Sequence, residues 1–319
     1  MASLAPNTSR QETHEKKDVS KLTTSLHRIG QELRPTLPYK IILSRISDGE
    51  PVTDCKLKKI HLIRHGQGFH NVAQTEWRAA KKPGEPYWIS TDPDFKYLDP
   101  ELTPLGIQQA TDLQTETLHL NPDLIIVSPM RRAIQTALLG FEKHIKSDGT
   151  CNESTSSTST STSTTDNTDA TDTTTDNGSN KRSKISIESS SSIRILANEN
   201  AHEIAGKHTC DKRLNKTELI KLYPMIDFSL IESESDPFWG NGEIRESHLS
   251  VSKRGASLME EIRICKETNI VIAAHSTILF SLLNAVIHIE GNNDENNNYD
   301  ISWFGTGEMR SFYVRWEEN

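Results

Sequence analysis

The strongest constraint on the fold is a repeated alternation of short apolar runs with longer segments of helical pattern. Runs at 59–63, 124–128 and 269–274 are rich in apolar residues and too short for typical helices. Such runs are typical of strands that are buried on both faces of a sheet. Because helical segments separate them, we predict a three-layer α/β fold, with a mostly parallel central sheet and helices on both faces.

The predicted elements follow this alternation along the chain. Thr103 can cap a helix, and Pro104 suits the first helical position. We expect strands at 39–46, 59–63, 124–128, 193–196, 269–274 and 309–316, and helices at 19–33, 104–118, 131–145, 215–222, 253–266 and 277–288.

A polar segment at 148–192 interrupts this pattern and dilutes the apolar content. Hydrophobic residues make up 34% of the chain, and the 45 residues of this segment include only four. A Ser/Thr-rich sequence with so few apolar side chains cannot gain enough from burial to offset the entropy lost when its backbone is ordered. We therefore predict a disordered insertion. Residues 1–37 are also polar, and we expect a flexible N-terminal extension before a single domain at 38–319.

Charge and hydropathy exclude several classes of partner. The chain has 36 basic and 44 acidic residues and a formal charge of −8, so it lacks the broad basic surface typical of nucleic-acid binding. The most hydrophobic stretch, 278–289, is too short and too polar to cross a bilayer. We therefore expect no nucleic-acid partner and no membrane association.

Cysteine spacing and the terminal sequence bear on the location of the protein. The cysteines at 55, 151, 210 and 265 form no C-x-x-C pair, and residues 1–17 lack the apolar core of a signal peptide. The small basic patch at 181–184 fits either a solvated charge run or a targeting element. We expect a reducing compartment: the cytoplasm, with the nucleus as an additional location.

Polar side chains follow the predicted parallel strands at or near the point where each one ends. They are Arg64 with His65, Arg132, Glu199 with Glu203, and His275 with Ser276. In open α/β sheets, ligands bind beyond the carboxyl ends of the strands, so we expect these side chains to converge. Two arginines and two histidines in one place indicate a dianion such as phosphate.

Apart from Glu199, these residues lie in four of five motifs that occur along the chain. The motifs are L-I-R-H-G at 62–66, L-T-P-L-G-I-Q-Q-A at 102–110, S-P-M-R-R-A-I-Q-T-A at 128–137, E-I-A-G-K-H-T-C-D-K-R at 203–213 and A-H-S at 274–276. In this order they resemble the motifs of the histidine phosphatase superfamily, also called phosphoglycerate mutase-like. The longer R-H-G-Q-G-F-H-N at 64–71 is similar to a phosphomutase-like subgroup from fungi and plants. The resemblance covers most of 57–316 and implies the phosphoglycerate mutase-like fold.

Chemistry and the resemblance together imply catalytic roles. His65 would be the nucleophile that forms a phosphohistidine. Glu203 would protonate the leaving oxygen and then activate water. The groups that would hold the phosphoryl oxygens are Arg64, Arg132 and His275.

The resemblance also implies residues that bind substrate. They are Gly66, whose missing Cβ would let the substrate approach the backbone, together with Gln67, Asn71 and Ser276. We expect no metal and no other cofactor, because cationic side chains would take the place of a metal.

The sequence leaves alternatives for two residues and for one segment. Glu199 competes with Glu203 as the acid, although the Cys210-Asp211 pair supports the register that selects Glu203. We interpret Cys210 as a buried structural thiol rather than a nucleophile. The segment 307–310 could either contact the site or pack at the edge of the core.

The favoured function is a phosphatase that hydrolyses the phosphate monoester of a small phosphorylated substrate. One alternative is a phosphoglycerate mutase-like phosphomutase, which needs a bisphosphate cofactor and a pocket that retains the intermediate. Another is a catalytically silent scaffold, because fold does not determine function. No sequence feature for retaining a released intermediate is evident, so hydrolysis is favoured. Substrate identity and oligomeric state do not follow from the sequence.

Overall fold

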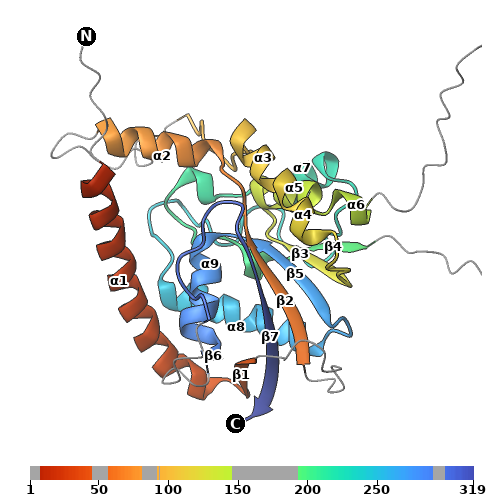
Figure 1. Ribbon diagram of the computed structural model, residues 1–319. Helices are drawn as coiled ribbons and strands as arrows, with labels where there is room; N and C mark the ends of the chain where they lie inside the picture. Colours follow the sequence, from red (N-terminus) through yellow and green to blue (C-terminus); the bar gives the residue numbers. More distant parts are fainter. Residues whose placement is uncertain (1–7, 45–56, 81–91, 93, 146–192, 290–298) are drawn as a thin grey trace, which may run out of the picture.

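The computed structural model describes residues 8–44, 57–80, 92, 94–145, 193–289 and 299–319 (Figure 1). The insertion predicted at 148–192 lies outside these residues. Within the described ranges, no helix combines the length and apolar character needed to cross a membrane.

A seven-stranded mixed sheet forms the centre of the fold. In spatial order its strands are β4 (Arg194–Ala197), β3 (Leu124–Val127), β5 (Asn269–Ala274), β2 (Leu57–Arg64), β7 (Met309–Glu318), β1 (Tyr39–Ser44) and β6 (His288–Ile289). The first four run parallel, and β6 is parallel to β1. β7 runs antiparallel to both β2 and β1. The predicted α/β class with a mostly parallel sheet is confirmed.

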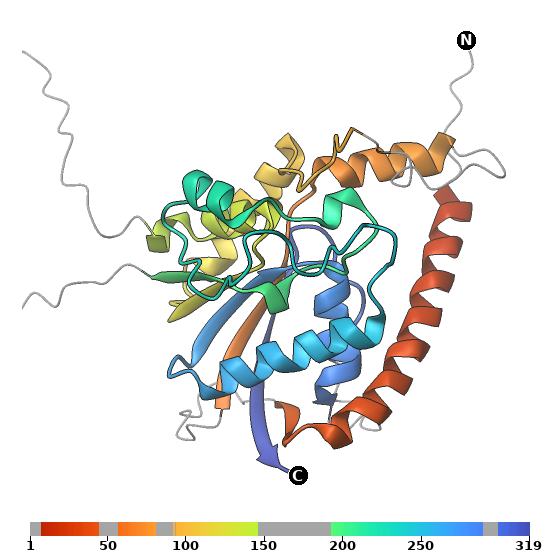
Figure 2. The same cartoon turned by 180° about the vertical axis from the view of Figure 1, so that it is seen from behind.

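Helices cover both faces of this sheet (Figures 1 and 2). One face carries α3 (Pro104–Asp112), α4 (Gln114–Thr117), α5 (Arg131–Gly140), α6 (Glu142–Ile145) and α7 (Lys216–Leu222). The other carries α8 (His248–Ile264), α9 (Ser276–Ser281), a π-helical turn (Leu282–Val286) and the long α1 (Thr8–Leu33). α2 (Phe69–Ala80) lies beyond the end of β2, and 3-10 turns occur at Arg34–Thr36, Glu199–Ala201 and Thr209–Asp211.

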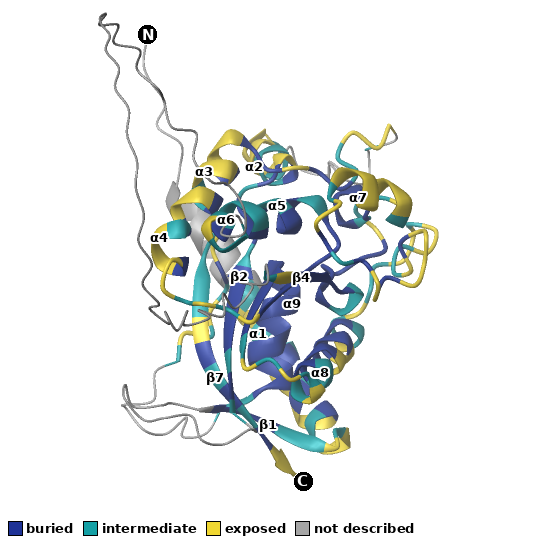
Figure 3. Ribbon diagram, turned by 90° about the vertical axis from the view of Figure 1, so that its right-hand side faces the viewer, coloured by how far each residue is buried: buried dark blue, intermediate teal, exposed yellow. Residues whose placement is uncertain are grey.

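Alternate residues of the central strands point into two separate cores. In β3, Leu124 and Ile126 join the core under α8 and α9, whereas Ile125 and Val127 join the core under α5. All four are at most 3% exposed, and Figure 3 shows the central strands as buried. This two-sided burial is what a short continuous apolar run predicts.

Local sequence signals set the ends of several helices. The Thr103 hydroxyl accepts a hydrogen bond from the Gly106 N–H at 3.1 Å, so the predicted cap of α3 is confirmed. α8 begins at His248 rather than at 253, because Ser247 caps it by accepting from the Ser250 N–H. The predicted helix at 131–145 is divided at Phe141, whose backbone leaves the helical range.

The structure corrects the prediction of a flexible extension for residues 19–37. Leu26 of α1 is fully buried against Phe280 and Ala285, and Leu33 joins the main core. An amphipathic helix needs only a narrow apolar stripe to pack, so the polar composition of this segment concealed its role.

Two glycines hold the loop after β2 against the start of α3. A Cβ atom on Gly106 would collide with the carbonyl oxygen of Gln67, and one on Gly66 would collide with the carbonyl oxygen of Gly106. Backbone atoms cannot move aside as a flexible side chain does. Close approach of the two segments therefore requires glycine at both positions.

Gly106→Ala is expected to lower the free energy of unfolding by about 1–3 kcal/mol, because the added methyl group overpacks this contact. Denaturation in guanidinium chloride measures the change. Gly305→Ala is the matched control, since the nearest atom to its added Cβ is the end of the Glu308 side chain at 3.3 Å. The control should change stability by less than about 0.5 kcal/mol. Equal losses in the two variants would contradict the requirement for glycine.

Candidate active site

Three parallel strands deliver polar side chains to one edge of the sheet. β2 ends at Arg64 and is followed by His65, β3 is followed by Ser128, and β5 is followed by His275. The His65 N–H donates to the Ala274 carbonyl at 3.0 Å, so the sheet still holds the backbone at this point. The side chains therefore project from rigid elements.

A cavity of about 660 Å³ opens at this edge. The predicted site residues that line it are Arg64, His65, Gln67, Asn71, Arg132, Glu203 and Ser276. Gly66 and His275 are not part of the lining. Other lining residues include His70, His208, Cys210, Asp211 and Arg245, with Val19 and Leu22 from α1 and Trp303 from the loop before β7.

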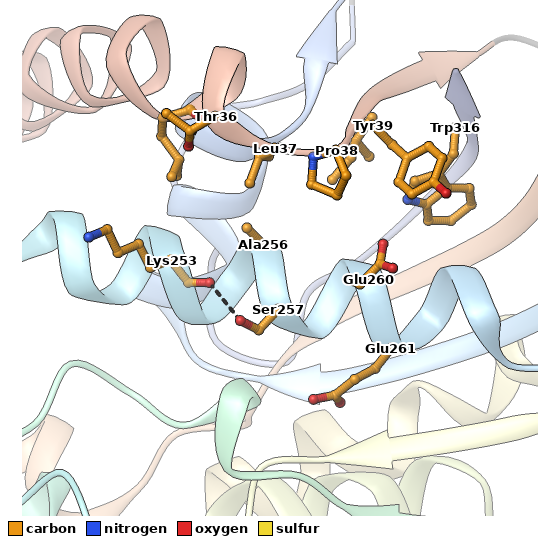
Figure 4. A pocket seen from close by; sticks show the side chains of 12 residues that line it. Thr36, Leu37, Pro38, Tyr39, Lys253, Ala256, Ser257, Glu260, Glu261 and Trp316 are labelled. Atoms are coloured by element: carbon orange, nitrogen blue, oxygen red, sulfur yellow. Dashed lines mark hydrogen bonds between the residues drawn. The ribbon is translucent and has the colours of Figure 1, made fainter. Parts of the chain in front are cut away.

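A second cavity, of about 540 Å³, lies between helix α8 and the link from α1 to β1 (Figure 4). Leu33, Tyr39 and Trp316 contribute apolar wall. The charged lining residues in the described part of the chain are Lys253, Glu260 and Glu261. One lysine beside two carboxylates would not attract a phosphate dianion, so the first cavity is the candidate site.

His65 is held in one tautomer and one protonation state. Its Nδ1 lies 2.6 Å from the Gly66 carbonyl oxygen, and its Nε2 lies 3.2 Å from Nε of Arg132. A carbonyl only accepts and a guanidinium only donates, so Nδ1 carries the proton and Nε2 keeps its lone pair. Burial, followed by Arg132 and Arg64, lowers the pKa of His65 well below its usual value. The neutral ring therefore has its nucleophilic nitrogen at the cavity.

Arg132 links His65 to a carboxylate that sequence reasoning left without a role. Its Nη1 donates to the Cys210 carbonyl at 2.7 Å, and its Nη2 pairs with Oδ1 of Asp211 at 3.3 Å. Oδ2 of Asp211 accepts from Nη1 of Arg245 at 2.8 Å. Burial raises the pKa of Asp211, but Arg245 and Arg132 outweigh burial and lower it. The charged Asp211 thus holds both arginines at the cavity.

The sequence assigned no contact to Asp211 or Arg245, and the two residues differ in the signal that they carry. Asp211 lies inside the motif at 203–213, whereas Arg245 lies in a loop outside every motif.

Burial raises the pKa of the Cys210 thiol well above its usual value, which fits the structural role predicted for Cys210.

The two candidate acids have different surroundings. Glu203 lines the cavity, and its Oε2 accepts from the Thr277 N–H at 3.3 Å. Oε1 of Glu199 instead accepts from Nε and Nη2 of Arg213, at 2.9 and 2.6 Å, and Glu199 is not part of the lining. The geometry favours Glu203 as the group that can reach a bound substrate.

His275 lies beside the ring of His65, with 5.0 Å between ring centroids. Its Nε2 is 2.8 Å from the Ser128 hydroxyl, and its Nδ1 is buried with no hydrogen-bond partner among the described residues. Burial lowers the pKa of His275 well below its usual value, so the ring is neutral. Direct contact of His275 with a phosphoryl oxygen stays a prediction.

The structure supplies a packing reason for one predicted substrate-binding residue. The Cβ position of Gly66 faces the backbone of Gly106, so packing requires a glycine here, and contact of Gly66 with a substrate stays a prediction. Gln67 and Asn71 do line the cavity, and the Asn71 side chain also accepts from the Gly68 N–H at 2.9 Å.

The segment before β7 contacts the site through its backbone. The Gly307 N–H donates to the carbonyls of Arg64 and His65, at 3.2 and 3.1 Å. Arg64 in turn donates from Nη1 to the Phe304 carbonyl at 2.6 Å. Gly307 therefore contacts the backbone at the site, whereas Met309 packs against the core, so each interpretation of 307–310 holds for part of the segment.

Three largely buried ion pairs surround the segment that carries Glu203. They are Arg213–Glu199 at 2.6 Å, His202–Asp236 at 3.1 Å and Arg254–Glu246 at 2.8 Å. Arg254 also donates to the carbonyls of His202 and Glu203, at 2.9 and 3.3 Å. These contacts fix the backbone beside the candidate acid.

Within these pairs, His202 is a buried imidazolium. Its Nδ1 lies 2.7 Å from the Glu203 carbonyl oxygen, and its Nε2 lies 3.1 Å from Oδ2 of Asp236. Both partners accept hydrogen bonds, so both ring nitrogens carry protons. Burial and Arg254 act to lower the pKa of His202, but Asp236, assisted by Glu199, outweighs them and raises it.

Asp236→Asn is expected to lower the free energy of unfolding by about 3 kcal/mol at pH 6, because His202 loses its buried counter-ion. The pKa of His202 is raised in the folded state, so the stability it contributes is complete below its unfolded pKa of about 6.5 and is lost as pH rises through the folded value. Guanidinium unfolding should therefore show the difference between wild type and variant shrinking as pH rises above about 6.5.

The matched control for this variant is Asp227→Asn, which removes the partner of the more exposed Arg194. It should cost less than about 1 kcal/mol. A loss in Asp236→Asn that does not vary with pH would contradict the charged state of His202.

The chain is similar in sequence to known proteins. Residues 60–153 match the Histidine phosphatase superfamily (branch 1). Phosphoglycerate mutase-like protein from Arabidopsis thaliana is 37% identical over 234 residues, which cover 72% of this chain and 75% of the relative. Phosphoglycerate mutase-like protein 1 from the same plant is 32% identical over 236 residues, covering 72% of each chain.

Among solved structures, phosphoglycerate mutase from Bacillus anthracis is 13% identical, with 84% of this chain and 94% of that chain covered and a TM-score of 0.43. The sequence relatives are much closer than this, and they carry the family assignment. The chain belongs to the histidine phosphatase superfamily and to its phosphomutase-like subgroup.

Proposed function

We propose that the protein is a phosphatase that hydrolyses the phosphate monoester of a small substrate through a phosphohistidine on His65. The observation that supports this most strongly is the state of the His65 ring. The ring is neutral, Nδ1 donates to Gly66, and the lone pair of Nε2 faces Arg132. Transfer first to histidine and then to water would divide one difficult reaction into two easier steps.

In this mechanism Arg132 and Arg64 bind the phosphoryl oxygens. Arg132 Nε donates to His65 Nε2 in the free site. A phosphoryl oxygen that accepts this hydrogen bond instead would leave the lone pair free to attack phosphorus. The guanidinium groups then stabilise the charge on the transferred group. His275 would donate from Nδ1 to another oxygen, while the Ser128 hydroxyl donates to its Nε2.

Glu203 acts on the proton in both steps. As the ester bond to phosphorus breaks, the protonated carboxyl donates to the leaving oxygen and releases the alcohol. The resulting carboxylate then accepts a proton from the water that attacks the phosphohistidine. The electrons of the P–N bond return to Nε2 of His65, and inorganic phosphate is released.

A mutase and a catalytically silent scaffold are the two alternatives. A mutase would return the phosphoryl group to the substrate at a second position, without net release of phosphate. A scaffold would bind phosphate without any turnover. Measurement of phosphate release separates both of them from a phosphatase.

His65→Ala is expected to reduce phosphate release by roughly 10³-fold or more, because the nucleophile is absent. The assay follows inorganic phosphate from a panel of phosphate monoesters with the full-length protein. His119→Ala, a change at an exposed histidine outside the cavity, is the control and should retain wild-type rates. Phosphate release by His65→Ala at the control rate would contradict the mechanism.

Glu203→Gln should lower kcat by roughly 10²–10⁴-fold, because the amide can neither donate nor accept the required proton. Glu199→Gln is the matched comparison. It should chiefly reduce stability, since it removes the carboxylate that pairs with the buried Arg213. A larger loss of kcat in folded Glu199→Gln than in Glu203→Gln would reverse the assignment.

A further inference from the structure

We propose that His70 is a further residue that contacts the phosphoryl group, with Nε2 of its ring donating a hydrogen bond to one phosphoryl oxygen. The proposal rests on the phosphatase function above and adds a contact that the mechanism does not use. Three observations support it: the place of the ring beside His65, the ring nitrogens that the protein leaves without partners, and the packing of the ring on Gly68.

Helix α2 places the His70 ring beside the nucleophile. His70 is the second residue of this helix, is 8% exposed, and lines the cavity together with His65. The centroids of these two rings are 5.7 Å apart, compared with 5.0 Å between the rings of His65 and His275. A phosphoryl group on Nε2 of His65 would therefore lie close to two further imidazole rings. The mechanism above uses the ring of His275 and gives no role to that of His70.

The guanidinium group of Arg132 also lies close to His70. Burial is the main cause that lowers the pKa of His70, and the positive charge of Arg132 is the next, with a smaller opposing effect of Asp211. Burial and then Arg132 lower the pKa values of His65 and His275 in the same order. Interactions between charges weaken with distance, so one guanidinium group is near all three rings. A phosphoryl group that Arg132 binds would therefore be near His70.

Among the described residues, the protein pairs the ring nitrogens of other buried histidines but not those of His70. Both ring nitrogens of His61, His65 and His202 have hydrogen-bond partners within 3.2 Å. Nδ1 of His70 is buried with no partner in the described part of the chain, as is Nδ1 of His275. Buried polar atoms without partners are rare in folded proteins and destabilising, so an unpaired ring in this cavity indicates a ligand.

Packing on Gly68 determines which nitrogen of His70 a ligand can reach. A Cβ atom on Gly68 would lie 2.7 Å from Nδ1 and 2.8 Å from Cε1 of the ring, so this edge of the ring rests against the glycine backbone. Nε2 is not enclosed in the way that Nδ1 is. A ligand in the cavity can therefore reach Nε2, whereas Nδ1 faces the loop.

A neutral ring can supply the proposed hydrogen bond. Because its pKa is well below the usual value, His70 is neutral near pH 7, and its one ring proton can reside on Nε2 while Nδ1 keeps the lone pair. Hydrogen bonds to an ionised acceptor are stronger than those between neutral groups. The phosphoryl oxygens are charged before, during and after transfer, so the contact would support phosphate binding as well as turnover.

Binding of inorganic phosphate to the full-length protein tests the contact without turnover. His70→Ala should raise the Kd of phosphate in calorimetry by roughly tenfold, because one hydrogen bond to a charged acceptor is lost. His119→Ala, at an exposed histidine outside the cavity, is the control and should leave the Kd unchanged. A wild-type Kd in folded His70→Ala would overturn the contact.

Two conservative variants test which ring nitrogen donates. The side-chain amide of His70→Gln can place an N–H near the position of Nε2, so this variant should keep the Kd within about threefold of the wild-type value. The shorter amide of His70→Asn matches Nδ1, so this variant should lose as much affinity as His70→Ala. It also serves as the second variant if His70→Ala does not fold. Equal loss of affinity in His70→Gln and His70→Asn would overturn Nε2 as the donor.

The same proteins separate this proposal from the proposed function. Release of phosphate from monoesters by the wild-type protein, together with phosphate binding that depends on His70, supports both. Release by the wild-type protein with an unchanged phosphate Kd in folded His70→Ala overturns the contact alone. Binding that depends on His70, without any release, would overturn the phosphatase function and leave the contact standing.

Discussion

The backbone contact between Gly66 and Gly106 determines where the proton of His65 resides. The contact fixes the loop after β2 against α3, and within that loop the Gly66 carbonyl accepts from Nδ1 of His65. With Nδ1 protonated, the lone pair is confined to Nε2, which Arg132 faces. The packing of the two glycines therefore influences which ring nitrogen of His65 carries the proton. Displacement of this carbonyl would leave Arg132 as the one contact among the described residues that sets the tautomer.

Carboxylates that pair with arginines allow those arginines to gather at the cavity. The whole chain has a formal charge of −8, yet buried and part-buried arginines converge near one edge of the sheet. Arg132 and Arg245 share Asp211, and the pairs Arg213–Glu199 and Arg254–Glu246 support the segment beside them. An unpaired buried charge costs several kcal/mol, so each of these cations depends on its carboxylate. A negative net charge is thus compatible with a local site for an anion.

A helix or strand could be predicted from the sequence where the residues that determine it lie close together in the chain. β3 and β5 were evident because both of their faces are apolar, and α3 because its cap is encoded within a few residues. α2 was missed, and its one buried residue is a histidine, His70, rather than an apolar side chain. β6 was missed because it has only two residues, and its pairing with β1 depends on a contact far along the chain.

The candidate site shows the same division. The motifs identified the residues at the ends of the parallel strands, where chemistry and topology coincide. Their register favoured Glu203 over Glu199, but it did not give the physical difference, which is the ion pair that Glu199 makes with Arg213. The contact of Arg245 could not be assigned for a related reason, since its partner Asp211 is distant in sequence.

The stretch that matches the family, 60–153, contains only part of this site. It carries His65 and Arg132, whereas Glu203, Asp211 and helix α1 all lie outside it. The proposed nucleophile and the proposed acid are thus encoded in separate stretches of the chain. A substitution outside 60–153, for example in α1, can alter the wall of the cavity while His65 and Arg132 stay unchanged.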